Sequence, residues 1–350
     1  MLTSTAIPRL QAQLDAERRM VSFDSYDMTV RQLLDMYNQG AIFVPPEYQR
    51  QFVWDEERES ELIESIFLGI PIPNLFMATN LDSTWEVVDG VQRLSTLVHY
   101  VQPSDRRLAA IARKTPLKLT SLEKLTELKG TTYDDLPSSL QLLFQTRPLR
   151  LTVLNDKSDL NVRFDLFERL NTGGILLSDQ EIRNCVYRGP FNDQLKNLAK
   201  SSSFRTAVLL KDSDQKNGMA EEYVLRFFAY AYGRSEFDHS VRGFFNNFMK
   251  AHASKKLTAA QLKLFRDTMA LLAEVFPNGI TRGKAGTTSA VLYEALAVGV
   301  SDVLRAKGKI SKAKLAALTK DAILNRYTTG ATNSRKMLIN RISHVANSIV

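Results

Sequence analysis

Residues 86–97, with the sequence EVVDGVQRLSTL, combine a β-branched run, a glycine and an arginine in an order that suits anion binding. The two valines favour an extended chain, Gly90 permits a tight turn, and the apolar spacing that follows predicts a helix. N–H groups in the first turn of a helix have no partner within it, and Arg93 adds a positive group beside them. This segment predicts a phosphate-binding turn. In the alternative interpretation, Asp89 caps the helix and Arg93 points into water.

Two other polar clusters share this placement at the end of an expected strand or helix. Loops at such ends can converge on one crevice while the core stays apolar, so the three clusters together predict one site. Each cluster alone is also compatible with a surface turn. The two clusters are Glu47, Gln49 and Arg50 with Trp54, and Arg169 with Asn171, Thr172, Gly173 and Gly174.

The elements that would position these residues are strands and helices up to about residue 154 and helices beyond it. The first forty residues are expected to be a mostly helical lead-in. Asp55 and Gly69 mark the start and stop of a helix, and Ser178 with Glu181 forms a capping box for another. Strands are expected at 74–79, 84–90 and 147–155, and a helix with Phe164, Phe167 and Leu170 on its inner face at 158–174.

These elements predict an α+β protein, with a mixed α/β domain over 1–180 and a mainly helical domain over 181–350. The formal charge of +8 is concentrated near the end, because residues 281–350 hold twelve Lys or Arg and three acids. Such a basic segment suits a polyanion such as DNA, although solvated lysines are the alternative. The residues expected to contact DNA are Lys307, Lys309, Lys312, Lys314, Arg335 and Lys336.

Apolar runs in this chain are too short to span a membrane, and the first twenty residues lack the apolar core of a signal peptide. We therefore expect a cytoplasmic protein with no membrane partner. The single cysteine, Cys185, excludes an intramolecular disulfide.

Four segments in order resemble the N-terminal domain of GmrSD-type modification-dependent restriction proteins, of the ParB and sulfiredoxin-like superfamily. The resemblance is continuous over residues 29–188. It implies a small ParB/sulfiredoxin-like core that binds a nucleoside triphosphate with Mg²⁺ and hydrolyses it. The four segments are PPEYQRQFVW, ELIESIFLGIPIP, VVDGVQRLSTL and FERLNTGGILLSDQEIRN.

The resemblance also assigns roles to individual residues. It implies that catalysis uses Asp89, which would also hold the metal, together with Gln92, Arg93 and Glu47. Val91 departs from the family pattern, which usually has Gln there, and this puts turnover in doubt because valine cannot hold a water. The residues implied to bind nucleotide are Gln49, Arg50, Trp54, Gly90, Val91, Ser95, Asn171, Thr172 and Gly174.

Three functions remain open at this stage. The first is a triphosphate-hydrolysing component of a DNA-targeting defence system, with cleavage supplied by a partner nuclease. The second is a DNA-binding regulatory module that senses nucleotide without turnover, and the third is a ParB-like nickase. Many relatives carry a C-terminal HNH nuclease domain, but the histidines here lack that metal-site spacing, so a stand-alone form, possible as a homodimer, is expected.

Overall fold

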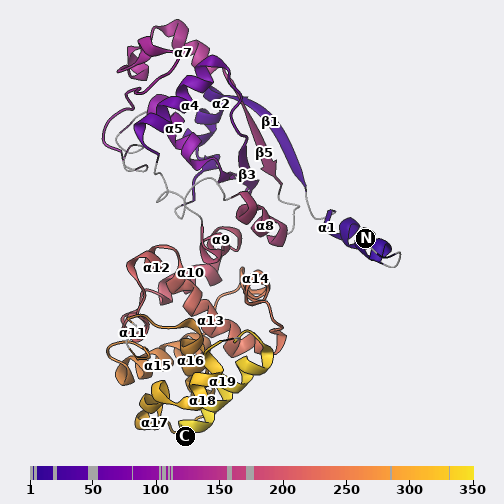
Figure 1. The fold of residues 1–350 in the computed structure, drawn as a ribbon, viewed down its shortest axis with the longest axis vertical. Coiled ribbons are helices and arrows are strands. Elements are labelled where there is room, and N and C mark those ends of the chain that lie inside the picture. The colour runs from indigo at the N-terminus through magenta and orange to yellow at the C-terminus, as the bar shows by residue number, and fades with distance from the viewer. Residues whose placement is uncertain are drawn as a thin grey trace. The chain divides into compact units, whose positions relative to one another are not determined.

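The chain divides into two compact units, Met1–Leu176 and Leu177–Val350, a few residues before the boundary expected at 180 (Figure 1). The first unit holds a mixed sheet with helices, and the second is helical, so the predicted α+β class is confirmed. The computed structural model describes residues 3, 6–18, 22–45, 54–80, 82–101, 104, 108, 111, 113–155, 160–170, 177–283, 286–330 and 332–350.

Five strands among the described residues form one sheet in the order β1-β5-β3-β4-β2. Strands β3 (Leu75–Thr79) and β4 (Trp85–Asp89) are antiparallel neighbours, and β5 (Pro148–Leu154) runs parallel to β3. Strand β2 (Ile42–Phe43) pairs with β4 over two residues. The alternate residues of β5 from Leu149 to Val153 are buried, as expected for a strand with one face on a core. The predictions for β3, β4 and β5 are confirmed.

The lead-in is mostly helical, as predicted, because it holds α1 (Ala6–Arg18) and α2 (Val30–Asn38), but it also contains a strand that was not expected. Strand β1 (Phe23–Thr29) pairs antiparallel with β5 along its whole length. Its FDSYDMT sequence is polar and its side chains are mostly exposed, so no apolar alternation identifies it. Backbone pairing holds it to the sheet, and Arg150 makes two 2.9 Å hydrogen bonds to the Asp27 carboxylate beside it.

Helix α4 (Glu56–Leu68) begins and ends where its sequence predicts. The Asp55 carboxylate accepts a 2.9 Å hydrogen bond from the N–H of Arg58, and Gly69 adopts the left-handed conformation at φ 71°. The other helices of this unit are α1 (Ala6–Arg18), α2 (Val30–Asn38), α5 (Val91–Val101), α7 (Ser138–Gln145) and α8 (Leu160–Leu170), with short 3₁₀ turns η1 (Thr126–Leu128) and η2 (Tyr133–Asp135).

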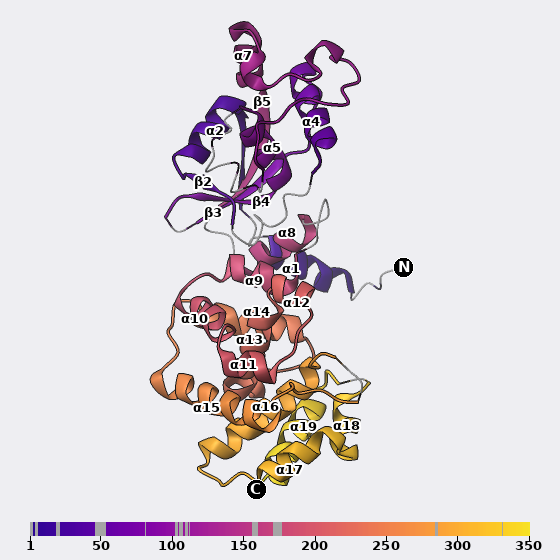
Figure 2. The same cartoon turned by 90° about the vertical axis from the view of Figure 1, so that its left-hand side faces the viewer.

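Helices α2, α4, α5 and α7 pack on one another within this unit (Figure 2). Apolar side chains of these helices lie in the core, including Leu33 of α2 and Ile63 of α4, both fully buried. Helix α8 contacts β4 and buries Phe164 and Phe167 completely, whereas Leu170 is only half-buried.

Helices make up the regular structure described beyond residue 177, as predicted. Ser178 and Glu181 form the expected capping box at the start of α9. Phe227, Phe265 and Tyr293 are fully buried in an aromatic core. In the parts of the chain with assigned structure, no helix is long and apolar enough to cross a membrane. The helices and 3₁₀ turns are α9 (Asp179–Val186), α10 (Pro190–Leu198), α11 (Ser202–Ala207), α12 (Asp212–Lys216), α13 (Met219–Gly233), η3 (Arg234–Glu236), α14 (Val241–His252), α15 (Ala259–Val275), α16 (Ala290–Arg305), α17 (Lys312–Ala317), η4 (Leu318–Lys320), α18 (Ala322–Thr328) and α19 (Arg335–Ser348).

Candidate functional site

The predicted phosphate-binding turn is a strand-to-helix corner in which β4 ends at Asp89, Gly90 turns the chain and α5 starts at Val91. We call residues 89–93 the Gly90 corner. Gly90 has φ 98°, a conformation that L residues with side chains rarely adopt. A Cβ atom there would lie 3.1 Å from Leu75 Cδ2, so the position requires glycine for both space and backbone conformation. The corner therefore places the first N–H groups of α5 at a turn that only glycine fits well.

Arg93 is buried and bonded within the protein. Its Nη2 donates to Asp89 Oδ2 at 2.7 Å, and its Nη1 donates to the carbonyl oxygens of Asn74, at 3.1 Å, and Pro73. The alternative in which Arg93 points into water is therefore wrong. Because the guanidinium ties the segment before β3 to the end of β4, Arg93 holds the shape of the corner.

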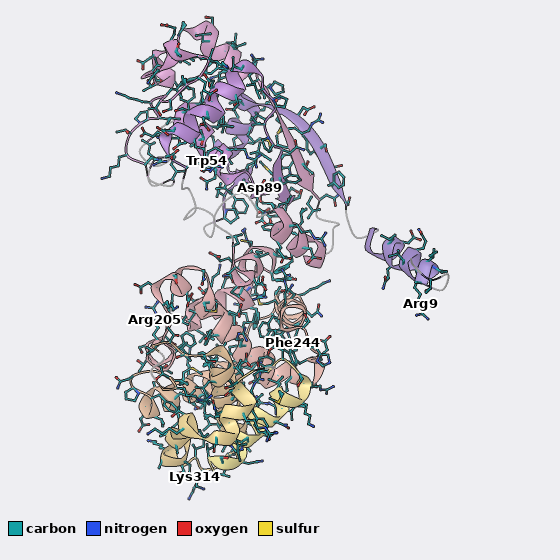
Figure 3. The ribbon with its side chains drawn as sticks, in the orientation of Figure 1. Arg9, Trp54, Asp89, Arg205, Phe244 and Lys314 are labelled. Atoms are coloured by element: carbon teal, nitrogen blue, oxygen red, sulfur yellow. The ribbon has the colours of Figure 1, made fainter. Side chains whose placement is uncertain are left out.

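Trp54 joins a second predicted cluster to this corner. Its backbone N–H donates to Gln92 Oε1 at 3.3 Å, and its indole ring lies 5.0 Å from the guanidinium carbon of Arg58. Figure 3 shows Trp54 and Asp89 at the same end of the unit. Trp54, the one described member of its cluster, is thus in contact with the corner.

Other residues expected at the site are buried, exposed on α8 or outside the described residues. Val91 is 8% exposed and Ser95 is 4% exposed, so both side chains pack within the unit. Arg169 is exposed in the last turn of α8. The residues that lie outside the described part of the chain are Glu47, Gln49, Arg50, Asn171, Thr172, Gly173 and Gly174.

Asp89 is the carboxylate of the corner, and its side chain is 30% exposed. Within the described ranges, no group of three or more His, Cys, Asp or Glu side chains is arranged to hold a metal ion. Mg²⁺ that travels with a triphosphate needs only one or two carboxylates, because phosphate oxygens and water complete its octahedron. A single accessible aspartate at the corner fits that requirement.

The basic C-terminal segment is partly used by the fold. Lys312 pairs with Glu274, and Lys314 donates to the carbonyl oxygen of Val350. Arg341 is 2% exposed and bonded to Glu294. Exposed side chains remain at Lys307, Lys309, Arg335 and Lys336. The charge available to a polyanion is therefore smaller than the composition suggests.

Sequence reasoning missed a set of hydrogen bonds between α4 and the segment 113–125. Burial alone would raise the pKa of Glu64, but the backbone N–H groups of Leu125, Lys124 and Glu123 outweigh it and lower the pKa. Acidic residues of an amphipathic helix usually mark its solvent face, so α4 gave no signal that they bind this segment.

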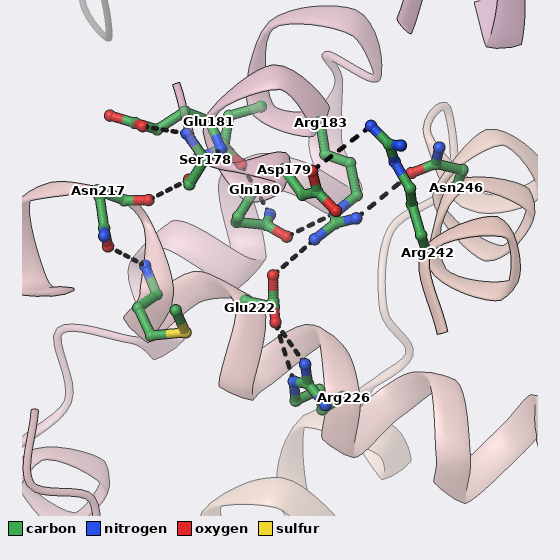
Figure 4. A network of polar contacts seen from close by, with 12 residues as sticks. Ser178, Asp179, Gln180, Glu181, Arg183, Asn217, Glu222, Arg226, Arg242 and Asn246 are labelled. Carbon is green, nitrogen blue, oxygen red and sulfur yellow. Dashed lines mark hydrogen bonds and ion pairs between the residues drawn. The ribbon is translucent and has the colours of Figure 1, made fainter. Parts of the chain in front are cut away.

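The second unit contains an ionic network that the sequence also did not reveal (Figure 4). Glu222 of α13 accepts from Arg183 of α9 at 2.6 Å and from Arg226 at 2.6 Å. Arg226 also pairs with Glu294, which accepts from Arg341 at 2.5 Å. Burial alone would raise the pKa of Glu222, but Arg226 and Arg183 outweigh it and lower the pKa. The network joins α9, α13, α16 and α19 in one core.

Comparison with known families identifies a domain that covers most of the first unit. Residues 30–188 match the family model of the GmrSD restriction endonuclease, N-terminal domain, which confirms the resemblance drawn from the four segments. Searches of curated proteins and of solved structures found no match for the chain. The matched residues run through α9, so they include the Arg183 end of the ionic network.

Proposed function

We propose that this chain, whose residues 30–188 form a GmrSD N-terminal domain, is the nucleoside-triphosphate-binding component of a defence system that restricts DNA. The triphosphate binds at the Gly90 corner. The observation that carries the proposal is the hydrogen bond between the Trp54 N–H and Gln92 Oε1, because it holds Trp54, four residues after Arg50 in the sequence, against the corner.

The corner supplies backbone N–H donors to the triphosphate and an oxygen ligand to its Mg²⁺. The N–H groups of Val91 and Arg93 belong to the first turn of α5, where the helix dipole favours negative charge. Asp89 offers a hard oxygen ligand to the Mg²⁺ that accompanies the triphosphate, and this ion would neutralise phosphate charge. Arg93 keeps Asp89 and the Pro73–Asn74 backbone in place.

The proposal is for binding of the triphosphate. One observation favours nucleotide sensing without rapid hydrolysis. Val91 is 8% exposed and apolar, so it cannot position an attacking water. The nucleotide then acts as a signal, and a partner nuclease cuts the DNA. The domain family and the exposed lysines at 307 and 309 support an interaction with DNA.

Three measurements on the purified chain test the proposal. Each of the four triphosphates with Mg²⁺ is added in a melting experiment, and at least one should raise the melting temperature, because a ligand of the folded state stabilises it. Phosphate release is then measured with and without duplex DNA. DNA affinity should fall steeply with salt, and Lys307→Ala with Lys309→Ala should reduce the slope of log K against log salt. No shift with any triphosphate contradicts the proposal.

A further inference from the structure

Two buried side chains, Glu59 and His99, and the partly buried Arg113 form a group of polar contacts in the first unit. Glu59 of α4 is fully buried, His99 of α5 is 1% exposed, and the Arg113 side chain is 27% exposed. Glu59 Oε2 lies 2.6 Å from His99 Nδ1, and Glu59 Oε1 accepts from Arg113 Nη2 at 2.6 Å. A fully buried carboxylate between two basic groups is costly unless each contact is kept, so this arrangement holds its members in fixed positions.

The proton pattern of this group follows from its acceptors. His99 Nε2 lies 2.9 Å from the carbonyl oxygen of Thr115, which can only accept, so Nε2 carries a hydrogen. A second proton must then lie between Nδ1 and Glu59 Oε2, since two acceptors do not attract each other. Both oxygens of Glu59 and both ring nitrogens of His99 are therefore engaged, and the group is locked to the Thr115 backbone.

This group is connected to the corner through Trp54. Arg113 Nη2, which binds Glu59, also donates to the carbonyl oxygen of Trp54. The N–H of Trp54 in turn donates to Gln92, so the Trp54 peptide groups are held from both sides. Gln92 and His99 are seven residues apart on α5, about two turns, and lie on the same face. The contacts thus close a ring that starts and ends on α5.

We propose that Glu59, His99 and Arg113 form a positioning relay that fixes Trp54 against the Gly90 corner, with Arg113 as the residue that sets this position. Through this position Arg113 sets the affinity of the corner for a triphosphate. The affinity part of the inference rests on the proposed function.

The chain contains two tryptophans, so a Trp85→Phe parent makes Trp54 the sole indole reporter. In this parent, Arg113→Met removes both hydrogen bonds of Nη2 and keeps much of the side-chain volume. Arg113→Lys keeps a positive donor and serves as the rescue variant. Arg150→Met is the matched control, because Arg150 lies in the same unit and pairs with Asp27 at an exposed site. Trp54 emission, acrylamide quenching and triphosphate affinity are measured for each folded variant.

We expect Arg113→Met to shift Trp54 emission to longer wavelength, to increase its quenching and to weaken triphosphate binding by about tenfold. Arg113→Lys should lie between this variant and the parent, and Arg150→Met should match the parent. If Arg113→Met does not fold, Arg113→Gln, which keeps one amide donor, is measured in its place with the same expectation.

Parent-like emission and affinity in a folded Arg113→Met or Arg113→Gln variant would overturn the inference. A shift of Trp54 emission with unchanged triphosphate affinity would overturn the claim that Arg113 sets this affinity. A parent chain that binds no triphosphate contradicts the proposed function itself and is recognised before any variant is made. In that case the emission of Trp54 still decides whether Arg113 positions it.

Discussion

Trp54 donates its backbone N–H to the side-chain oxygen of Gln92 at 3.3 Å, although the two residues are 38 apart in the chain. This contact is specific to the fold, because Trp54 precedes α4 whereas Gln92 opens α5. It holds Trp54, just before α4, against the strand-to-helix turn.

Gly90→Ala should destabilise the protein by about 1–3 kcal/mol for the positive φ, plus about 1 kcal/mol for the close contact with Leu75. The matched control is Gly130→Ala, because Gly130 also has positive φ but its Cβ would meet nothing within 4 Å. Urea unfolding of both variants separates the two contributions. Equal losses would show that the contact with Leu75 has no cost.

Val91→Gln should raise single-turnover phosphate release at saturating triphosphate, while affinity stays within about tenfold, or 1.4 kcal/mol. The reason is that glutamine can hold a water where valine cannot. Because Val91 is 8% exposed, the variant should also lose some stability, and circular dichroism must first show that it is folded. A folded variant with unchanged release would make Val91 a packing residue alone.

Local signals were enough to predict the elements that form the corner. Alternating and β-branched residues identified β3, β4 and β5, and Asp55 and Gly69 identified both ends of α4. Strand β1 was missed because its polar FDSYDMT segment is held by backbone pairing to β5, more than a hundred residues later in the chain. Pairing between distant segments leaves no trace in local periodicity.

The site was predictable only in part, because its contacts also join segments that are distant in the chain. Asp89, Gly90 and Arg93 were recognised as a group, and the structure brings Gln92 to Trp54 as the convergence of clusters predicted. The sequence did not show that Arg93 binds backbone carbonyls or that His99 and Glu59 share a buried contact. Charged residues on amphipathic helices are most often solvated, so a buried pair is evident only once packing is known.

Glu222→Gln should cost about 3–5 kcal/mol, because it leaves Arg183 and Arg226 buried without a full counter-charge. The control is Glu274→Gln, which removes an exposed pair with Lys312 and should cost less than about 1 kcal/mol. Urea unfolding of the whole chain, followed by helix signal, measures both. Similar small losses would mean that the network contributes little to the second unit.

Stability should depend on pH through Glu64. Its pKa is lowered from the ordinary value of 4.5, so its carboxylate stabilises the fold above pH 4.5 and this contribution is lost as the pH falls through the folded-state pKa. Glu64→Gln should therefore be less stable than wild type above pH 4.5, with a difference that shrinks at lower pH. Glu61→Gln, an exposed change on the same helix, is the matched control for the substitution itself.

The central claim is that the Gly90 corner binds a triphosphate, and calorimetric titration tests it most directly. Wild type, Arg93→Met and the control Arg150→Met are titrated with the best triphosphate in the presence of Mg²⁺, after circular dichroism has shown that each is folded. Arg93→Met should weaken binding by about 1.5–3 kcal/mol, the size of a charge-assisted hydrogen bond, because Arg93 holds Asp89 and the corner in place. Arg150→Met should bind as wild type does. Equal affinity of wild type and Arg93→Met, or no binding heat with any triphosphate, would contradict the claim.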